Sequence, residues 1–509
     1  MSAHRPPFPP YQATMPLVEK LRALAEQFSG RTGRRSQASF HTPGHKRGQG
    51  ISPDLREWLG EAMFQADLPE LPELDNLFAP ESVIQQAQIL AAEAFGADQS
   101  WFLVNGSTCG VEAAILAVCS PGDRLILPRN VHQSAISGLI LSGAIPVFVE
   151  PEFDPAWDLA YGVTPQAIEA ALSQHPEAKA VLLVSPTYHG VCADIQTIAP
   201  IVHQYGIPLL VDEAHGSHFP FHPDLPTPAL QAGADLAVQS IHKTLSALTQ
   251  AAMLHLQGTR IDGDRLTRSL QLVQSTSPNY LLLASLDAAR QQMATQGKVL
   301  LTKTLDLAAH ARTQLPQILG VSMLTAEAIA RWDWFTLDPT RLTVDVTGLG
   351  LTGFEADELL HQTLGVTAEL PTLRQLSFIL SPANPHQDID RLIHAFQHLS
   401  AQYASPAALA APCPLLPRGM ALPPAALPPA LSPRQAFFAP SQTVAIESAL
   451  ARISAEWICP YPPGIPVLIP GEVITQAAID YLRQVQAAGG VMTGGTDPEL
   501  QTLKVVQSA

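Results

Sequence analysis

Lys243 is the residue whose position points most directly to covalent chemistry. The apolar run 234–238 predicts a buried strand, and Ser240, His242 and Lys243 follow it at once. Burying an ammonium group is unfavourable by several kcal/mol unless the group is paired or neutralised. A lysine with a lowered pKa can form a Schiff base with a carbonyl compound. The alternative is a lysine whose stem leaves the sheet while its ammonium reaches water, and Lys243 taken alone favours that alternative.

The segment before Lys243 predicts the sheet that must position it. From about residue 84 to 255, helical and strand patterns alternate, and the strands are continuous apolar runs. Such runs are typical of strands covered on both faces, and the alternation predicts a mostly parallel sheet. Ligands bind such sheets at the carboxyl ends of the strands. We predict strands over 100–104, 124–127, 146–149, 180–184, 208–211 and 235–238, with helices over 83–95 and 111–118.

Polar residues follow several of these strands. The loop 105–110 opens a helix, and its amide and hydroxyl groups suit a phosphate, although Ser and Thr also cap ordinary helices. His132 could stack on an aromatic ring or cap a helix. Asp212 directly continues an apolar strand, so we expect a buried carboxylate that needs a cationic partner. Together with Lys243, this set indicates pyridoxal phosphate, whose pyridine nitrogen the carboxylate keeps protonated and whose aldehyde the lysine holds.

Several other classes fit the sequence poorly. No G-x-G-x-x-G follows the first strand, which argues against a dinucleotide site. His215 and His218 have no third ligand at a defined spacing, and the five cysteines contain no C-x-x-C pair, so we expect no metal. The formal charge of −16 without a long basic block argues against nucleic acid. Because neither a signal peptide nor an apolar run of ~18 residues is present, we expect a cytoplasmic protein without a membrane partner.

A chain of 509 residues is too long for one core, so we expect several domains. Leu17, Leu21, Leu24 and Phe28 recur at helical spacing and predict an N-terminal helix that ends at Gly30. Strands over 342–346 and 376–379 and a helix over 285–302 indicate a smaller α+β unit. We divide the chain into an arm (1–40), a large cofactor domain (41–300), a small α+β domain (301–403), an Ala/Pro-rich linker (404–433) and a C-terminal domain (434–509).

The motifs around these residues resemble those of the prokaryotic ornithine/lysine/arginine decarboxylases, a fold-type-I pyridoxal phosphate family. The resemblance covers nearly the whole chain in the same order. It rests on His41-Thr-Pro-Gly-His-Lys46, Asn105-Gly-Ser-Thr108, Arg129-Asn-Val-His132, Asp212-Glu-Ala-His215, the stretch 240–250, Ser275-Thr-Ser-Pro278, Arg452-Ile-Ser-Ala-Glu456, Tyr461-Pro-Pro-Gly-Ile-Pro466 and Pro470-Gly-Glu472.

The resemblance implies an aspartate-aminotransferase-like α/β fold with a mainly parallel seven-stranded sheet and smaller α+β domains. It also implies roles for individual residues. Lys243, His242, His132 and Asp212 are the implied catalytic residues, with Lys243 holding the cofactor, His132 on its ring and Asp212 at its nitrogen. The further implied cofactor contacts are Gly106, Ser107, Thr108, Ala214, His215, Ser240 and Thr276, and the implied substrate contacts are His45, Glu456 and Glu472.

The implied activity is decarboxylation of a basic amino acid, arginine or lysine and possibly ornithine. In this family the active site lies at a homodimer interface, and the loop 275–276 reaches in from the partner subunit. Larger members form higher oligomers and begin with a wing domain; here the arm leads almost directly to His41, so the sequence resembles the short form. Two alternatives stay open: an aminotransferase or other lyase, for which Arg374 could grip a substrate carboxylate, and a non-catalytic regulatory paralogue.

Overall fold

A seven-stranded sheet forms the centre of the molecule. The computed structural model describes residues 10–28, 38–404, 430–461 and 464–507. The strand order is β1-β10-β9-β8-β6-β2-β3. The bounds are β1 Gln99–Leu103, β2 Arg124–Pro128, β3 Ile145–Val149, β6 Ala180–Val184, β8 Leu209–Asp212, β9 Leu236–Gln239 and β10 Ala252–Leu256.

Five neighbouring strands, from β9 to β3, are parallel, whereas β10 runs antiparallel to both β1 and β9. The predicted mainly parallel sheet is therefore confirmed, and all six strands predicted from the sequence are present. Strand β10 was missed, because the polar His255 interrupts its apolar run. That imidazole is buried, where its Nδ1 lies 2.7 Å from Ser100 Oγ and its ring stacks on Phe95.

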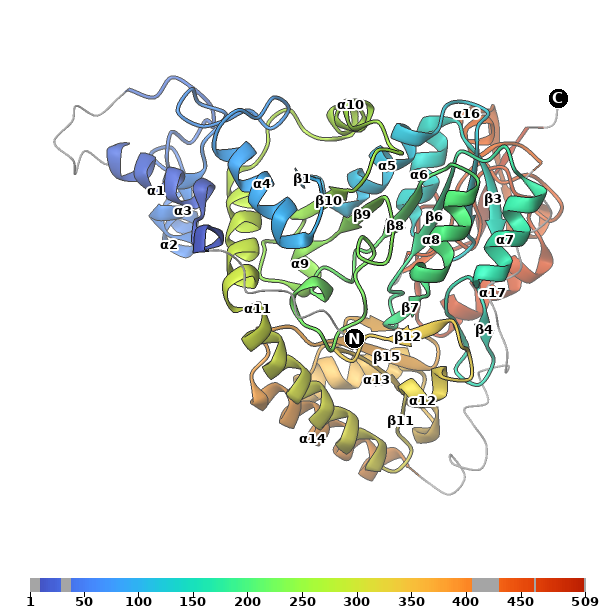
Figure 1. The fold of residues 1–509 in the computed structure, drawn as a ribbon. Coiled ribbons are helices and arrows are strands. Elements are labelled where there is room, and N and C mark those ends of the chain that lie inside the picture. Colours follow the sequence, from blue (N-terminus) through green and yellow to red (C-terminus); the bar gives the residue numbers. More distant parts are fainter. Residues whose placement is uncertain (1–9, 29–37, 405–429, 462–463, 508–509) are drawn as a thin grey trace.

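Both faces of the sheet are covered by helices, as the apolar strands require (Figure 1). Along β6, Leu182 packs with α5 (Gly106–Val118), α6 (Gln133–Ser142) and α10 (Gly263–Val273). Its neighbours Val181 and Leu183 pack with α7 (Pro165–Gln174) and α8 (Ile195–Gln204) on the opposite face. Alternate side chains of one strand thus enter two separate cores.

Helix α5 begins five residues earlier than the sequence predicted. The segment 106–110, expected as a loop, forms its first turns, and Asn105 is its N-cap. Gly106 has a φ of +76°, which glycine adopts without strain. Gly110 lets the helix approach the sheet, because a Cβ at that position would meet Leu103 and Val238 at 2.7 Å each. The small residues of this segment favoured a loop in the sequence, but in the structure a small residue is needed there so that the helix can pack closely on the sheet.

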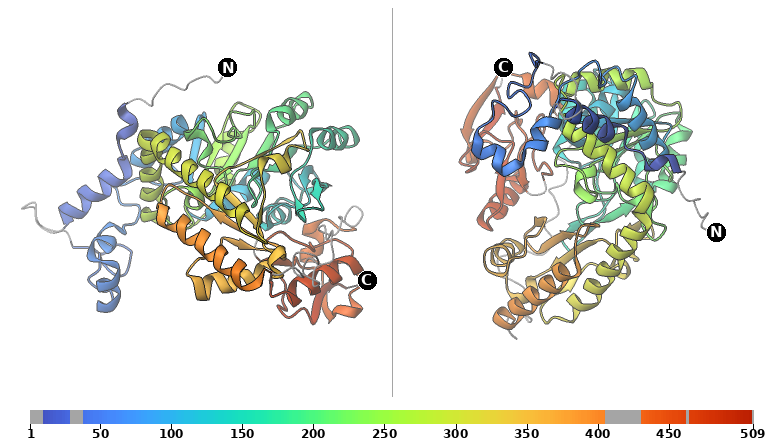
Figure 2. Two further views of the ribbon diagram at one scale, coloured as in Figure 1. Left: turned by 90° about the horizontal axis from the view of Figure 1, so that it is seen from below. Right: turned by 90° about the vertical axis from the view of Figure 1, so that its left-hand side faces the viewer.

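Helix α11 (Tyr280–Gln314) joins the large domain to the small one and includes the predicted helix over 285–302 (Figure 2). The helix crosses our proposed domain boundary at residue 300, so one continuous helix belongs to both proposed domains. The small domain contains the antiparallel sheet β11-β13-β15-β14. Its strands are β11 Ser322–Met323, β13 Arg341–Asp345, β14 Leu370–Pro371 and β15 Gln375–Ile379, and α14 (His386–Tyr403) packs against them.

The two ends of the chain pack on this framework. Leu17, Leu21 and Leu24 are buried along α1 (Pro16–Phe28), as predicted, whereas Gly30 lies outside the described residues. The C-terminal segment contains α16 (Pro433–Phe438), α17 (Gln476–Ala487) and the pairs β16 (Ser441–Ala445) with β19 (Thr502–Val506) and β17 (Cys459–Tyr461) with β18 (Val491–Thr493). Residues 405–429 of the predicted linker lie outside the described ranges.

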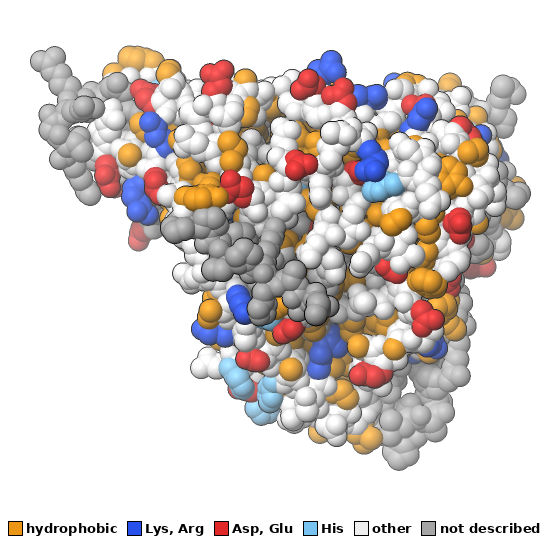
Figure 3. Space-filling model, in the orientation of Figure 1, with side chains coloured by type: hydrophobic (Ala, Val, Ile, Leu, Met, Phe, Trp, Pro, Cys, Tyr) orange, Lys and Arg blue, Asp and Glu red, His pale blue; other side chains and the backbone are white. Residues whose placement is uncertain are grey.

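On the face drawn in Figure 3, acidic and basic side chains are interspersed, with hydrophobic ones scattered between them. Among the described helices, none is both long enough and apolar enough to cross a membrane.

Candidate active site

Lys243 lies in the short helix α9 (Ile241–Thr244), directly after β9 and at the carboxyl edge of the parallel strands. Its Nζ is 3.1 Å from His215 Nε2 and 5.9 Å from the ring centre of Tyr188. Burial lowers the pKa of Lys243, an effect that the nearby carboxylates of Asp212 and Glu369 oppose. Because Lys243 is partly buried and its Nζ contacts His215, the surface-stem alternative is the weaker one.

Asp212 is the last residue of β8 and is buried, with 7% of its surface exposed. Its Oδ1 accepts a hydrogen bond of 3.2 Å from the amide of Ala214. No ion pair within 4 Å is present for this carboxylate among the described residues. Burial raises the pKa of Asp212, and Lys243 lowers it. A buried carboxylate without a bound cation is suited to a cationic ring nitrogen of a ligand.

The N-terminus of α5 is open to an anion. Asn105 makes no side-chain cap, and its Oδ1 instead accepts from the amide of Ser275 at 3.2 Å. Ser240 Oγ donates to Ser107 Oγ at 2.8 Å, which brings residues after β9 and β1 together. Uncapped amides, the helix dipole and two hydroxyl groups at one point are suited to binding a phosphate. The residues thus fit both ends of pyridoxal phosphate, its phosphate here and its ring near Asp212.

Two histidines beside Lys243 are neutral at pH 7. Burial, reinforced by the charge of Lys243, lowers the pKa of both His132 and His242 to about 4. His132 caps α6, accepting from the amide of Ser134 at 3.2 Å, so the capping alternative for this residue also holds. A neutral imidazole can lie against a pyridine ring without adding a second positive charge there.

The predicted substrate residues make other contacts within one chain. His45 lies in the loop before α2 (Pro53–Leu59), and its Nε2 is 3.0 Å from Asp67 Oδ2. Glu456 accepts hydrogen bonds from Thr496 and from the amide of Lys504. Thr276 is exposed in the loop that meets Asn105. Their role in substrate or cofactor binding stays a prediction.

Glu472 is held by Arg129 across the interface between the large domain and the C-terminal segment. The Nη2–Oε2 distance is 3.0 Å, and 3% and 4% of the two side chains are exposed. We expect Arg129→Met to lower the free energy of unfolding by about 3–5 kcal/mol, because it leaves a buried charge unpaired. Urea denaturation measures the change. Adding Glu472→Leu should restore part of it, and a single variant as stable as the wild type would contradict this role.

Glu213, next to Asp212, makes stability depend on pH. Burial raises the pKa of Glu213 to about 8, from an ordinary value of 4.5. Between these values the unfolded chain has lost a proton that the folded chain keeps, so stability falls as pH rises from 4.5 towards 8. We expect Glu213→Gln to flatten this fall, measured by urea denaturation at several pH values. Equal pH dependence in both proteins would contradict the assignment.

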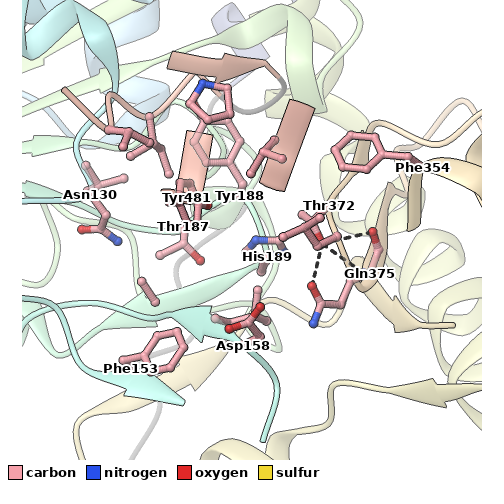
Figure 4. A pocket seen from close by; sticks show the side chains of 18 residues that line it. Asn130, Phe153, Asp158, Thr187, Tyr188, His189, Phe354, Thr372, Gln375 and Tyr481 are labelled. Atoms are coloured by element: carbon pink, nitrogen blue, oxygen red, sulfur yellow. Dashed lines mark hydrogen bonds between the residues drawn. The ribbon is translucent and has the colours of Figure 1, made fainter. Parts of the chain in front are cut away.

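The structure adds residues that the sequence did not identify. Tyr188 lies in the loop that follows β6, and Arg341 begins β13 in the small domain, where no local pattern marks it. Tyr188 also lines a cavity of about 130 Å³ with residues of all three parts of the chain, among them Phe354 and Tyr481 (Figure 4). Only the tertiary fold brings Tyr188 and Arg341 near Lys243.

Arg374, the residue considered for an aminotransferase, is bound elsewhere. Its Nη2 lies 2.9 Å from Asp345 Oδ2, and both side chains are largely buried. This ion pair holds the guanidinium within the small domain, which weakens its assignment as a substrate-carboxylate anchor.

Comparison with known proteins gives one family over most of the chain. The model of the Orn/Lys/Arg decarboxylase major domain matches residues 30–388, and that of the C-terminal domain matches 420–508. An arginine decarboxylase of Bacillus subtilis is 40% identical over 480 residues, which cover 93% of this chain and 95% of that protein. Lysine decarboxylase LdcA of Pseudomonas aeruginosa is 25% identical, over 91% of this chain and 75% of its own. The crystal structure of Francisella novicida lysine decarboxylase LdcF has the same fold, with a TM-score of 0.80, 21% identity and coverage of 97% and 81%.

Proposed function

This chain belongs to the Orn/Lys/Arg decarboxylase family, and we propose that it uses pyridoxal phosphate to release CO2 from a basic amino acid, with arginine as its preferred substrate. The observation that carries the proposal is the partly buried Lys243 near the carboxylate of Asp212, which has no ion pair among the described residues, together with the uncapped N-terminus of α5. The arginine decarboxylases among its relatives, at about 40% identity, support the choice of substrate.

Each side chain has a task in this reaction. When bound, pyridoxal phosphate supplies an electron sink for the broken carbon–carboxylate bond. The amides that open α5, with Ser107 and Ser240, would hold the phosphate. Asp212 would stabilise positive charge at the ring nitrogen, and His132 would pack on the ring. Lys243 would hold the cofactor and would deliver the proton that replaces the carboxylate on the α-carbon. The products are the amine and CO2, and one proton is consumed.

We further propose that the protein acts as a homodimer in the cytoplasm. Thr276 is exposed, and the amide of its neighbour Ser275 donates to Asn105, the N-cap of α5. Its exposed position close to the proposed phosphate-binding residues supports a contact with a second chain there. His45, Glu456 and Glu472 stay candidates for holding the basic side chain across such an interface.

The deciding experiment measures CO2 release in parallel from arginine, lysine and ornithine, with each amine product identified. We expect release with agmatine as the main product. Keto-acid formation would instead indicate an aminotransferase, and cofactor binding without CO2 release from any of the three would indicate a regulatory protein.

We expect Ser107→Ala to weaken cofactor binding about 10- to 100-fold, since a hydrogen bond to a charged group contributes about 1.5–3 kcal/mol. Titration of cofactor-free protein with pyridoxal phosphate measures the affinity. Ser173→Ala on the exposed end of α7 is the matched control. If the wild type, Ser107→Ala and Ser173→Ala bound pyridoxal phosphate with equal affinity, the phosphate would have to bind elsewhere.

A further inference from the structure

Three side chains from different parts of the fold form a continuous polar chain that ends at the reactive lysine. Arg341 Nη2 lies 2.9 Å from His215 Nδ1, and His215 Nε2 lies 3.1 Å from Lys243 Nζ. His215 comes from the loop after β8, Lys243 from α9 and Arg341 from β13 in the small domain. The imidazole thus connects a permanent cation to the proposed nucleophile.

The chemistry of these groups fixes where the protons lie. A guanidinium only donates hydrogen bonds, so Nδ1 of His215 must accept. A neutral imidazole has a single N–H, which therefore lies on Nε2, and a second proton on Nδ1 would face the guanidinium. The N–H on Nε2 needs an acceptor at Lys243. An ammonium has no lone pair, whereas a neutral amine has one.

We propose that Arg341 is a positioning residue that holds His215 in its Nε2–H tautomer, so that the imidazole donates to Lys243 and keeps that lysine a neutral amine. A neutral amine is the form that attacks a carbonyl group. The role in catalysis rests on the proposed function, but the proton arrangement is a property of the cofactor-free chain.

The surroundings of Arg341 agree with a dedicated role. Only 1% of its surface is exposed, and its Nε and Nη1 have no hydrogen-bond partner among the described residues. Leaving buried donors unpaired is unfavourable by about 1–3 kcal/mol per group. Gly190 makes room for the arginine stem, because a Cβ there would meet Arg341 Cβ at 2.6 Å. A structural arginine would more simply be satisfied by carbonyl groups, as Arg312 is by Pro339 and Leu324.

Other groups around Lys243 shift its pKa, some of them upward and some downward. The carboxylates of Asp212 and Glu369 favour its ammonium form, whereas burial and the charge of Arg341 oppose it. His132 and His242 are neutral, and Tyr188 presents its ring. Burial lowers the pKa of His215 well below its ordinary value, and the permanent charge of Arg341 lowers it further, so the imidazole stays neutral when Lys243 is a neutral amine. The hydrogen bond from His215 Nε2 and burial therefore both favour the neutral amine of Lys243, whereas the two carboxylates favour its ammonium form.

The first test is a measurement on the wild-type protein. Nitrogen-15 NMR of cofactor-free wild-type protein with labelled histidine reports the tautomer, and His215→Asn serves to assign the signal. We expect the Nε2–H form of His215 throughout the neutral pH range. An Nδ1–H or doubly protonated ring would overturn the proposal, whether or not the enzyme releases CO2. A wild-type protein with this tautomer but no decarboxylation would contradict the proposed function alone.

The second test measures the reactivity of Lys243 itself. Competitive acetylation of cofactor-free protein, quantified by mass spectrometry over a range of pH, gives the protonation midpoint of the amine, with exposed Lys298 as internal reference. We expect Arg341→Met to raise the protonation midpoint of Lys243 by about one pH unit. At a pH below the midpoint, this lowers the fraction of reactive neutral amine about tenfold. Arg341→Lys keeps a donor and should restore the wild-type profile.

A double-mutant cycle separates the imidazole from the charge of the arginine. In a His215→Phe background, Arg341→Met should raise the midpoint of Lys243 by less than it does in the wild-type background, because only the direct effect of the arginine charge remains. An equal shift in both backgrounds would show that charge alone is responsible and would overturn the proposal. Circular dichroism confirms that each variant is folded.

Discussion

Lys243→Ala is expected to abolish decarboxylation, with kcat lowered by at least about 10⁴-fold. The residue has two tasks, holding the cofactor and delivering the proton to the α-carbon, and alanine can do neither. The long-wavelength absorbance of protein-bound cofactor should be lost as well. Steady-state CO2 release and absorbance spectra measure the two effects on the same sample.

Lys298→Ala on α11 is the matched control, because this lysine is exposed and far along the chain from α9. It should keep both activity and absorbance. A Lys243→Ala protein that still releases CO2 at more than a trace rate would contradict the assignment of the nucleophile. A variant that binds the cofactor non-covalently but is inactive would agree with it.

Asp212→Asn is expected to lower kcat by about 10²- to 10⁴-fold while the protein stays folded. The carboxylate is buried without a bound cation, and its charge stabilises a protonated ring nitrogen; the amide of asparagine has a similar shape but no charge. Because Asp212 also favours the ammonium form of Lys243, its removal should lower the pKa of that lysine further. Activity and the competitive acetylation of Lys243 measure the two consequences separately.

Asp224→Asn gives the control, since 80% of that side chain is exposed. It should have no effect on either measurement. Asp212→Glu should recover part of the rate, because it restores the charge with a shifted position. If Asp212→Asn were as active as the wild type, the ring nitrogen would have to lie elsewhere.

Local sequence patterns predicted much of this protein correctly. Six apolar runs correspond to six strands of the central sheet, and the residues that follow them lie at its carboxyl edge. Ser107 and Ser240 even touch, although 133 positions separate them. These predictions succeeded because a parallel sheet places the ends of its strands side by side. Where the pattern failed, a buried polar residue or a small residue was the reason, as for His255 in β10 and for the start of α5.

The contacts around His215 could not be predicted in this way. Arg341 begins a strand of a different sheet, and nothing within its own segment distinguishes it from an exposed arginine. Likewise, the sequence does not show that Arg374 is paired with Asp345, or that Glu472, which stays a candidate substrate contact, is paired with Arg129. Residue type limits what a side chain can do, but its partner decides what it does.

The sequence by itself determined the chemistry available at the sheet edge: a lysine, a carboxylate and residues suited to a phosphate, each at the end of a strand. Only the tertiary structure decided which groups surround that lysine and lower its pKa. Protonation depends on burial and on the charges and hydrogen bonds within a few ångströms, and these come from three parts of the chain that meet only on folding.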